Sequence, residues 1–373
     1  MSRESRTIWA PVLRKVGVPM VIEEITVLPP QAGEVTVRLV ASGVCHSCLH
    51  SIDGSIGGTP MPIVLGDEGA GIVEDVGPGT TGLRPGDHVV LSWAPSCGAC
   101  RECLRGRPAR CRQKPAFGYL SGKTTRFCRG DEPIHHFGPS TFSPYVVVPS
   151  SGAIKINESV PLRQAALVGC SVTTGAGAVL RTAKVECGQS VAVIGCGGVG
   201  LNAVHAAHLV GANPIVAVDP VEIKLAAARH LGATATIEMS GSDVAEAIRA
   251  ETDGGADVVI VAVGNSLAIE QGVEALCPGG KCVVVGAPPS GETLSIDPHS
   301  LRGDEKMIMG SSYGSCNPPL DFPMFIELYR SGRFAIDDLV SRVYALTEIN
   351  EAFENLAMGN DLRGLIVFDE PEQ

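Results

Sequence analysis

The chain has 373 residues, 45% of them hydrophobic, and a formal net charge of −11. This length predicts two or three domains at roughly 150 residues per domain, and the negative charge argues against nucleic acid or an anionic membrane as a partner. Residues 1–8 show no secretory signal, and no apolar run reaches the roughly 18 residues of a membrane span. The 13 cysteines lack the pattern of a secreted disulfide scaffold, which favours a reducing cytoplasm.

The first third of the chain reads as strands and turns. Residues 35–40 alternate between apolar and polar side chains, and short apolar runs follow at 71–73 and 88–91, separated by Gly-Pro pairs. This pattern predicts a β-rich, barrel-like domain. Residues 113–142 are polar and basic without clear periodicity, so we expect a surface excursion there.

Four cysteines are packed into fifteen residues within this domain. They are Cys97, Cys100, Cys103 and Cys111, in a C-x2-C-x2-C-x7-C run. Four thiolates at such spacing can close a tetrahedral shell around one Zn²⁺, and the prolines and glycines between them prevent regular structure. We therefore predict a structural zinc site; disulfides or unrelated thiols are the alternative.

The pattern changes near residue 165, where apolar runs begin to alternate with helical stretches. Strands are predicted at 191–194, 215–218, 258–263 and 282–285, and helices at 199–209 and 222–231. Strands that are apolar throughout indicate a parallel sheet covered on both faces. After residue 311 the pattern is mixed, and segments 343–346 and 364–368 read as strands that rejoin the first domain.

A glycine motif lies between the first of these strands and its helix. Gly195, Gly197, Gly198, Val199 and Gly200 belong to a G-x-G-x-x-G sequence, and Asp219 ends the next strand 19 residues after Gly200. The glycines let backbone amides approach a pyrophosphate at a helix N-terminus, and Asp219 accepts hydrogen bonds from ribose hydroxyls while repelling a 2′-phosphate. This context predicts NAD rather than NADP; a glycine-rich turn in an unrelated α/β protein is the alternative.

Three more segments, 43–47, 66–71 and 169–175, together with the cysteine run, resemble the zinc-dependent medium-chain alcohol dehydrogenases. The resemblance covers essentially the whole chain, and it is greatest to the long forms, which include glutathione- or mycothiol-linked formaldehyde dehydrogenases and nicotinoprotein alcohol dehydrogenases. It implies a GroES-like catalytic domain at 1–168 and 312–373, with a structural-zinc lobe at 95–112. It also implies a doubly wound Rossmann domain at 169–311.

The resemblance implies a catalytic zinc held by Cys45, Asp67 and Cys170, with Glu68 nearby, and hence two zinc ions per chain. The family has histidine at the position of Asp67 and aspartate at that of Cys48. Because aspartate also binds zinc, and a carboxylate at position 48 would repel Asp67, we interpret the paired change as a re-tuned site. A vacant site, or Cys48 as a ligand, remains an alternative. Three anionic ligands against a charge of +2 make zinc a weaker acid, which predicts a higher working pH.

The same resemblance assigns the proton path to Ser47 and His50. It places a further set of residues at the cofactor: His46, Thr174, Val199, Lys224, Val263, Val285, Ala287 and Arg363. It implies an NAD-dependent dehydrogenase that interconverts a small-molecule alcohol and an aldehyde or ketone, and a homodimer in which the strand at 306–313 pairs with its copy. The alternatives are an NAD(P)H-dependent reductase without catalytic zinc and a redox-inactive NAD- or zinc-binding protein.

Overall fold

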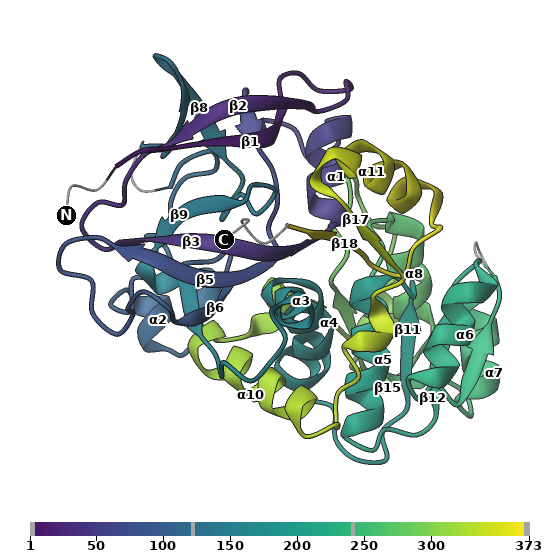
Figure 1. The fold of residues 1–373 in the computed structure, drawn as a ribbon. Coiled ribbons are helices and arrows are strands. Elements are labelled where there is room, and N and C mark those ends of the chain that lie inside the picture. The colour runs from purple at the N-terminus through teal and green to yellow at the C-terminus, as the bar shows by residue number, and fades with distance from the viewer. Residues whose placement is uncertain (1–3, 121–123, 240–242, 369–373) are drawn as a thin grey trace. The chain divides into compact units, whose positions relative to one another are not determined.

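A computed structural model describes residues 4–120, 124–239 and 243–368. The chain forms two compact units (Figure 1). The first unit comprises Met1–Cys170, Asn317–Arg330 and Val340–Gln373, and the second comprises Ser171–Cys316 and Ser331–Leu339. Among the described residues, no helix combines the length and the apolar character needed to cross a membrane.

The first unit contains a small closed barrel. Its strands follow one another around the barrel as β1 (Arg6–Leu13), β2 (Val21–Val27), β7 (Phe127–Arg129), β8 (Glu132–His136) and β4 (Ile63–Val64).

The barrel shows that the expected surface excursion at 113–142 was wrong. Strands β7 and β8 come from this segment, and Leu120, Phe127, Ile134 and Phe142 are buried in the core. The strands have only three and five residues, too short for a periodic signal, and the paired edges of the barrel supply their partners. Residues 121–123 lie outside the described part of the segment.

A larger sheet completes the first unit. In order across the sheet, its strands are β10 (Ala153–Lys155), β6 (His88–Leu91), β5 (Gly69–Val76), β3 (Glu34–Gly43), β18 (Gly364–Val367) and β17 (Arg342–Tyr344), with β9 (Tyr145–Pro149) also paired to β3. Strand β18 runs antiparallel to β3, with Ile366 opposite Ser42. The predicted return of the last two strands to the first domain is thus confirmed. The helices of this unit are α1 (His46–Asp53), α2 (Arg101–Leu104), α3 (Leu162–Ala166), α10 (Pro318–Arg330) and α11 (Ile349–Met358).

The second unit is built on a parallel six-stranded sheet. The order is β13 (Ala235–Ile237), β12 (Ile215–Val218), β11 (Val191–Ile194), β14 (Ala256–Val261), β15 (Leu276–Val284) and β16 (Met307–Gly310). The helices are α4 (Ser171–Gly177), α5 (Gly198–Leu209), α6 (Glu222–His230), α7 (Val244–Glu251), α8 (Ser266–Glu274) and α9 (Pro298–Gly303). All neighbouring strands pair in parallel, and the strand order is that of a doubly wound dinucleotide-binding fold, as predicted.

Candidate active site and metal centres

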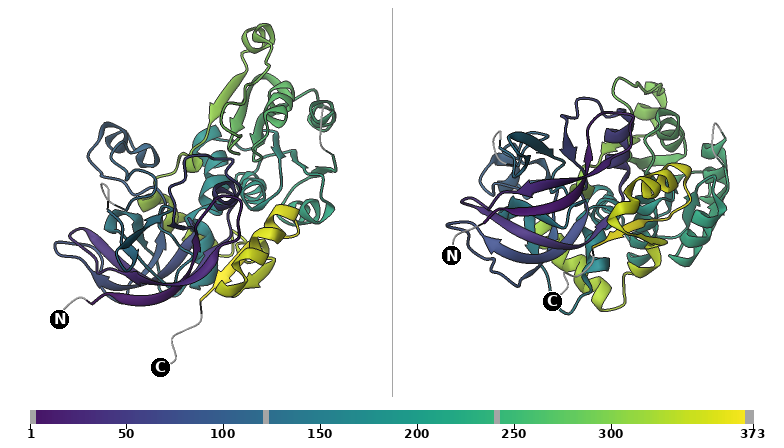
Figure 2. Two further views of the ribbon diagram at one scale, coloured as in Figure 1. Left: turned by 90° about the horizontal axis from the view of Figure 1, so that it is seen from above. Right: turned by 45° about the horizontal axis from the view of Figure 1, so that its top comes forward.

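The four-cysteine run folds into a lobe of the first unit (Figure 2). The four sulfur atoms lie within 4.8 Å of one another. Sγ of Cys103 is 3.5 Å from Sγ of Cys100 and 4.0 Å from that of Cys97. Sulfurs bound to one zinc at about 2.3 Å lie about 3.8 Å apart in a tetrahedron. Backbone N–H groups of Cys97, Cys100 and Gln113 donate to these sulfurs, as suits thiolates. The lobe therefore fits one zinc ion.

A second cluster joins three distant segments of the chain. Cys45 lies between β3 and α1 as the N-cap of the helix, Asp67 precedes β5, and Cys170 follows a short turn at 167–169. Antiparallel pairing of β3 with β5, with Ser42 opposite Gly69, brings the first two segments together. Gly169 packs against the same region so closely that an added Cβ would lie 3.2 Å from the Gly69 nitrogen and 2.9 Å from the Leu91 oxygen. A larger residue at position 169 would therefore force a local shift of the backbone next to Cys170.

The cluster has the composition and geometry of a metal site. The Sγ atoms of Cys45 and Cys170 are 3.8 Å apart, and Asp67 Oδ2 is 3.8 Å from Cys170 Sγ. Two sulfurs on one zinc would be about 3.8 Å apart. All three residues are buried, and within the described residues Asp67 Oδ1 has no hydrogen-bond partner. Because an orphaned buried carboxylate oxygen is costly, a cation is the partner that this donor set fits.

The three acidic groups depend on one another for their ionisation. Burial, reinforced by the Cys45 sulfur, raises the pKa of Asp67 to about 8. The hydrogen bond with Cys170 lowers the pKa of Cys45 to about 5. The same hydrogen bond, together with burial, raises the pKa of Cys170 well above its usual value. A divalent cation would favour the charged form of all three groups.

Ser47 lies directly at this cluster. Its hydroxyl oxygen is 3.1 Å from Cys45 Sγ and donates a short hydrogen bond to Asp67 Oδ2. His50 is half-buried on the same helix, with Nδ1 2.8 Å from Ser55 Oγ. Cys48 is fully buried, and burial beside Asp67 and Cys45 raises its pKa well above its usual value. Cys48 is thus a neutral neighbour of the carboxylate rather than a second charge.

The glycine motif of the second unit forms a tight turn between β11 and α5. Gly195 has φ +92°, and a Cβ on Gly200 would lie 1.8 Å from the Gly195 oxygen, so side chains are excluded at both positions. Gly197 directly precedes α5 as its N-cap, and a Cβ there would meet nothing within 4 Å. Open space beside backbone amides at a helix N-terminus is the room that a pyrophosphate requires. The apolar side chain of Val263, which follows β14, lies next to this turn.

Asp219 is buried at the end of β12, next to the glycine turn. Its Oδ2 accepts a hydrogen bond from the Cys196 N–H at 2.8 Å, and its Oδ1 accepts from the Val221 N–H at 3.0 Å. Lys224 on α6 lies 4.0 Å from Oδ1. The sequence showed the position of this carboxylate, but not that it also fastens the glycine turn.

Two family models and a curated relative match this chain. Residues 31–158 match the family model "Alcohol dehydrogenase GroES-like domain" and residues 198–331 match "Zinc-binding dehydrogenase". A protein of Schizosaccharomyces pombe named probable S-(hydroxymethyl)glutathione dehydrogenase 1 is 38% identical over 379 residues, covering 100% of both chains. The chain belongs to the zinc-dependent medium-chain alcohol dehydrogenase family.

Two solved structures are similar to this dehydrogenase over nearly its whole length. An alcohol dehydrogenase zinc-binding domain protein from Burkholderia ambifaria has a TM-score of 0.93 and 38% identity, covering 98% of this chain and 100% of that one. The benzyl alcohol dehydrogenase from Acinetobacter calcoaceticus has a TM-score of 0.92 and 36% identity, with the same coverage. The dehydrogenase is therefore an oxidoreductase with a GroES-like and a Rossmann fold, and its cofactors are zinc and NAD.

A buried ion pair in the dehydrogenase lies behind the three-ligand cluster, and sequence reasoning did not find it. Arg363 donates from Nε to Glu68 Oε2 at 2.9 Å and makes a second short contact from Nη2. Both residues are buried. Burial opposes the charge of Arg363, but Glu68, Cys45 and Cys170 outweigh burial and raise its pKa above the usual value. Separation by 295 residues left no local signal for this pair.

The remaining residues expected at the cofactor are divided between the two units. In the first, the His46 ring centroid is 6.4 Å from that of His50, and Arg363 is engaged with Glu68. In the second, helices α4 and α5 pack so closely that a Cβ on Gly175 would lie 2.1 Å from the Val199 oxygen, which brings the helix of Thr174 beside Val199. Val263, Val285 and Ala287 follow the carboxyl ends of β14 and β15. Contact of each with NAD stays a prediction.

Proposed function

We propose that this dehydrogenase interconverts a small-molecule alcohol and the corresponding aldehyde or ketone, with Cys45, Asp67 and Cys170 as the protein ligands of its catalytic zinc. The proposal rests on one observation, the three buried ligand atoms lying within 4.8 Å of one another. When bound, zinc supplies polarisation of the substrate oxygen and NAD supplies the hydride acceptor. Cys97, Cys100, Cys103 and Cys111 would hold the second, structural zinc.

The protein's own contribution to the chemistry is proton handling and orientation. The Ser47 hydroxyl touches both Cys45 and Asp67, so it is placed to accept the proton of a substrate hydroxyl bound at the cluster. His50, which is half-buried with one ring nitrogen fixed by Ser55, is suited to pass this proton toward solvent. Ser47 is the only member of the pair that contacts the cluster directly within the described structure, so we assign it the first transfer.

The ion pair of Glu68 with Arg363 has a supporting role in this proposal. The guanidinium is a fixed positive charge among anionic groups, since Cys45 and Cys170 both act on it. It offsets part of the excess negative charge that Asp67 brings in place of histidine. We therefore assign Arg363 the task of holding the ligands in their ionised form, besides any contact with the cofactor.

Turnover with defined alcohols tests the proposed function. Purified enzyme should reduce NAD with at least one member of a panel that includes S-(hydroxymethyl)glutathione and benzyl alcohol, the compounds named for its relatives. Ser47→Ala should lower kcat by about 100-fold with zinc content unchanged. Ser159→Ala changes an exposed serine of the same unit that contacts neither the cluster nor His50, and it is the matched control. Equal turnover after removal of the catalytic zinc would favour the alternative, an NAD(P)H-dependent reductase.

We further propose that the enzyme acts in the cytoplasm as a homodimer. Strand β16 is the last strand of the parallel sheet, and Met307 and Ile308 on it are 42% and 38% exposed. An apolar strand at a sheet edge offers unpaired backbone groups to a second copy of itself. This strand lies within the expected dimer segment, 306–313.

A further inference from the structure

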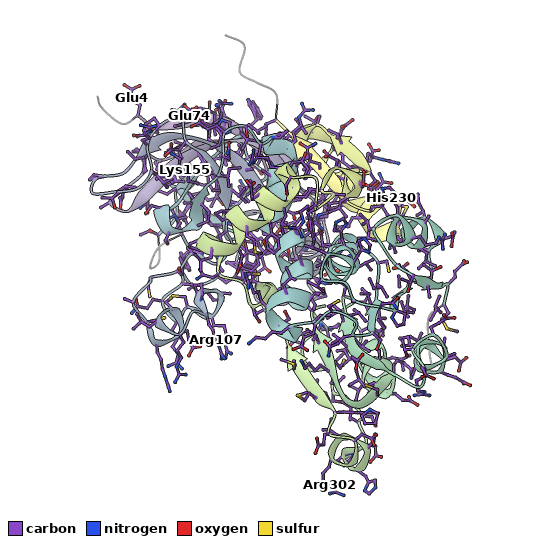
Figure 3. The ribbon with its side chains drawn as sticks, turned by 90° about the horizontal axis from the view of Figure 1, so that it is seen from below. Glu4, Glu74, Arg107, Lys155, His230 and Arg302 are labelled. Atoms are coloured by element: carbon purple, nitrogen blue, oxygen red, sulfur yellow. The ribbon has the colours of Figure 1, made fainter. Side chains whose placement is uncertain are left out.

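The zinc lobe carries five arginines within twelve residues of sequence, which together we call the lobe patch: Arg101, Arg105, Arg107, Arg110 and Arg112. All five side chains are exposed, and Arg107 is labelled on the lobe in Figure 3. Six basic residues and one acidic residue lie between 97 and 114, a formal charge of +5, so the rest of the chain carries −16 of the total of −11. Positive charge is thus concentrated in this one segment of an otherwise acidic chain.

The arginines of the lobe patch are also unlike other arginines of the chain. Among the described residues, none of the five is in an ion pair or a side-chain hydrogen bond. Elsewhere Arg14, Arg126 and Arg330 each contact a carboxylate at 2.6–2.8 Å. In a chain with 40 acidic residues, five neighbouring cations without partners are an electrostatic cost, because like charges repel.

The zinc centre accounts for part of this charge only. Zinc with four thiolates has a formal charge of −2, which would leave the lobe at +3. The sulfurs are already stabilised by backbone N–H groups of Cys97, Cys100 and Gln113. Guanidinium groups are therefore in excess of what the metal centre needs.

Two apolar side chains in or just after this segment are also exposed. Leu104, at the end of α2, is 76% exposed, and Phe117 is 45% exposed. Arginine combined with exposed aliphatic and aromatic side chains is typical of protein–protein contact surfaces. A phosphate group would leave Leu104 in water, whereas a protein partner can cover it.

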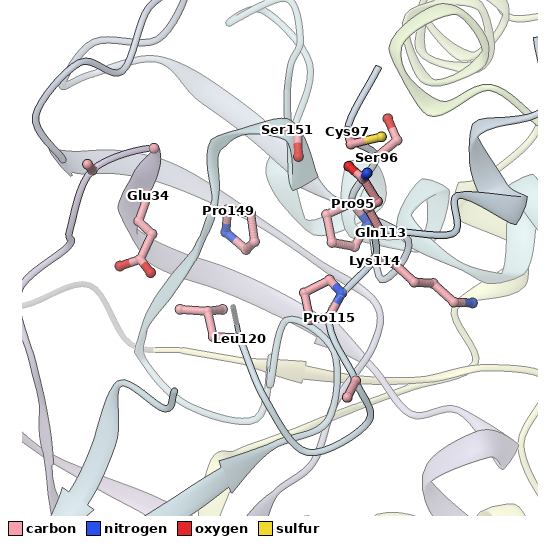
Figure 4. Close-up of a pocket in the computed structure, with 13 residues that line it drawn as sticks. Glu34, Pro95, Ser96, Cys97, Gln113, Lys114, Pro115, Leu120, Pro149 and Ser151 are labelled. Atoms are coloured by element: carbon pink, nitrogen blue, oxygen red, sulfur yellow. The ribbon is translucent and has the colours of Figure 1, made fainter. Parts of the chain in front are cut away.

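A cavity of about 380 Å³ adjoins the lobe patch (Figure 4). Ser96, Gln113 and Lys114 line it from the lobe, and Ser151 lines it from the short helical turn between β9 and β10. Glu34 at the same cavity is neutralised by Arg126, which makes two hydrogen bonds of 2.8 Å to its carboxylate. The cavity therefore offers polar donors next to the cations, with its one carboxylate already paired.

We propose that the lobe patch is a docking site for a short acidic segment of a different protein, with carboxylates on the arginines and an apolar side chain against Leu104. A long nucleic acid would extend beyond the patch onto the rest of the chain, which carries a formal charge of −16 and would repel its phosphates. A second copy of this chain would either bring two basic patches together or associate without closure. A short acidic segment meets neither difficulty.

Binding of defined peptides to the full-length, zinc-loaded enzyme tests the proposal. Two labelled synthetic peptides of equal charge serve as probes, one of repeating Glu-Glu-Leu and one of repeating Glu-Glu-Ser, with single-stranded DNA of matched charge as a third. Fluorescence anisotropy measures Kd from about 50 mM to about 200 mM NaCl, where surface charges are increasingly screened. We expect the Glu-Glu-Leu peptide to bind most tightly, and its affinity to fall with salt.

Charge reversal supplies the matched variants. Arg101→Glu/Arg105→Glu/Arg107→Glu should weaken peptide binding by at least about tenfold. Arg163→Glu/Arg302→Glu/Arg333→Glu changes the net charge equally at exposed arginines elsewhere and should leave Kd within about twofold. Leu104→Ser should abolish the preference for the leucine peptide.

Zinc content is measured in each variant to show that the lobe remains folded. If the triple variant fails to fold, Arg105→Glu and Arg107→Glu singly carry the test, each with an expected loss of roughly fivefold. Three results would overturn the proposal: no peptide binding by wild type at low salt, DNA binding as tight as that of the peptide, or the same loss in the control triple variant. If the wild-type enzyme self-associates in a salt-dependent way and the lobe triple variant does not, the patch binds a second copy of this chain instead.

Discussion

Asp67 is the residue on which the character of the catalytic site depends. Its carboxylate is buried, close to two thiol groups and hydrogen-bonded by Ser47, yet its Oδ1 has no partner within the described structure. A group in such surroundings either remains protonated or binds a cation. Burial raises its pKa to about 8, which shows how strongly the site without a cation disfavours the charge.

We predict that Asp67→Ala lowers zinc content from two ions per chain toward one, because two thiolates alone hold the catalytic ion weakly. Metal analysis of protein purified without chelator measures this. Asp131→Ala removes an exposed carboxylate of the same unit and should keep both ions. Full zinc content and unchanged activity in Asp67→Ala would show that Asp67 is not a ligand.

The neighbouring Cys48 makes a second test at this site possible. In Asp67→His alone, the introduced imidazole has no carboxylate beside it, because position 48 holds a fully buried thiol. Adding Cys48→Asp should orient the imidazole, so the double variant should bind zinc about 10- to 100-fold more tightly than Asp67→His. Competition with a zinc chelator measures the two affinities, and equal values would refute this coupling.

Asp219 combines a role in recognition with a role in the fold. We predict that Asp219→Ser lowers the preference for NAD over NADP by about 10- to 100-fold, since one charged acceptor for the ribose hydroxyls and one repulsive charge are lost. The ratio of kcat/KM with the two cofactors measures this. Glu246→Ser, an exposed change on α7, should leave the ratio unaltered. A wild-type enzyme that used both cofactors equally would contradict the assignment.

At the scale of elements, the zinc lobe has little apolar core of its own. Helix α2 has four residues, and Leu104 is turned to solvent. The structure of the lobe must therefore come from the metal and from N–H groups that donate to sulfur. The lobe resembles small metal-dependent domains in this respect.

We predict that Cys103→Ser removes one zinc ion and lowers the free energy of unfolding by at least about 2 kcal/mol, because structural zinc contributes directly to folding. Thermal unfolding with parallel metal analysis tests this. Cys128→Ser alters a half-buried thiol on β7 outside the metal clusters and serves as control. Retention of two zinc ions in Cys103→Ser would exclude the four-cysteine site.

The barrel segment around β8 depends on a buried, neutral histidine. His136 Nε2 accepts a hydrogen bond from the Arg126 N–H at 3.0 Å, and its ring is stacked on Phe127 with centroids 4.5 Å apart. Burial, assisted by the Arg126 and His135 charges, lowers the pKa of His136 to about 3. Between about pH 6.5 and about pH 3, the unfolded chain therefore binds one more proton than the folded chain.

This difference predicts a loss of stability with acid. The free energy of unfolding should be highest above pH 6.5. Below pH 6.5 it should fall by about 1.4 kcal/mol per pH unit, a loss of about 2 kcal/mol at pH 5. Denaturant unfolding at the two pH values, with zinc saturating, measures the change. His136→Gln should show a smaller loss, whereas His299→Gln, at an exposed position, should behave as wild type. Equal losses in all three proteins would contradict the assignment.

At the scale of the whole molecule, the open edge of β16 determines the proposed assembly. We predict a homodimer by light scattering at micromolar concentration, and a shift to monomer in Ile308→Lys, since lysine on an edge strand opposes pairing. Leu320→Lys changes another exposed apolar residue, on α10, and should remain dimeric. A monomeric wild type would refute the dimer.

Much of the fold could be predicted from local patterns. The limits of β6, β11 and β12 agree with the predicted strands. Strands β11 and β12 could be predicted because a buried parallel strand is apolar throughout and is bounded by glycine or a helix, and the antiparallel β6 because its short apolar run follows a Pro-Gly turn. The four-cysteine lobe is a local structure, in which the ligands are near one another in sequence. For the same reason the glycine motif and Asp219 could be placed before the structure was known.

Long-range contacts were decided by tertiary structure alone. Asp67 and Cys170 are 103 residues apart, and Glu68 and Arg363 are 295 apart, so only the pairing of strands brings them together. A resemblance suggested the three ligands, but nothing in the sequence showed the ion pair or the unpartnered oxygen. Segment 113–142 gave no periodic signal because its strands are short, and they become strands only where the barrel provides partners and burial. Local sequence patterns were enough to predict the motifs and the parallel sheet, whereas long-range packing determined which charges are buried together.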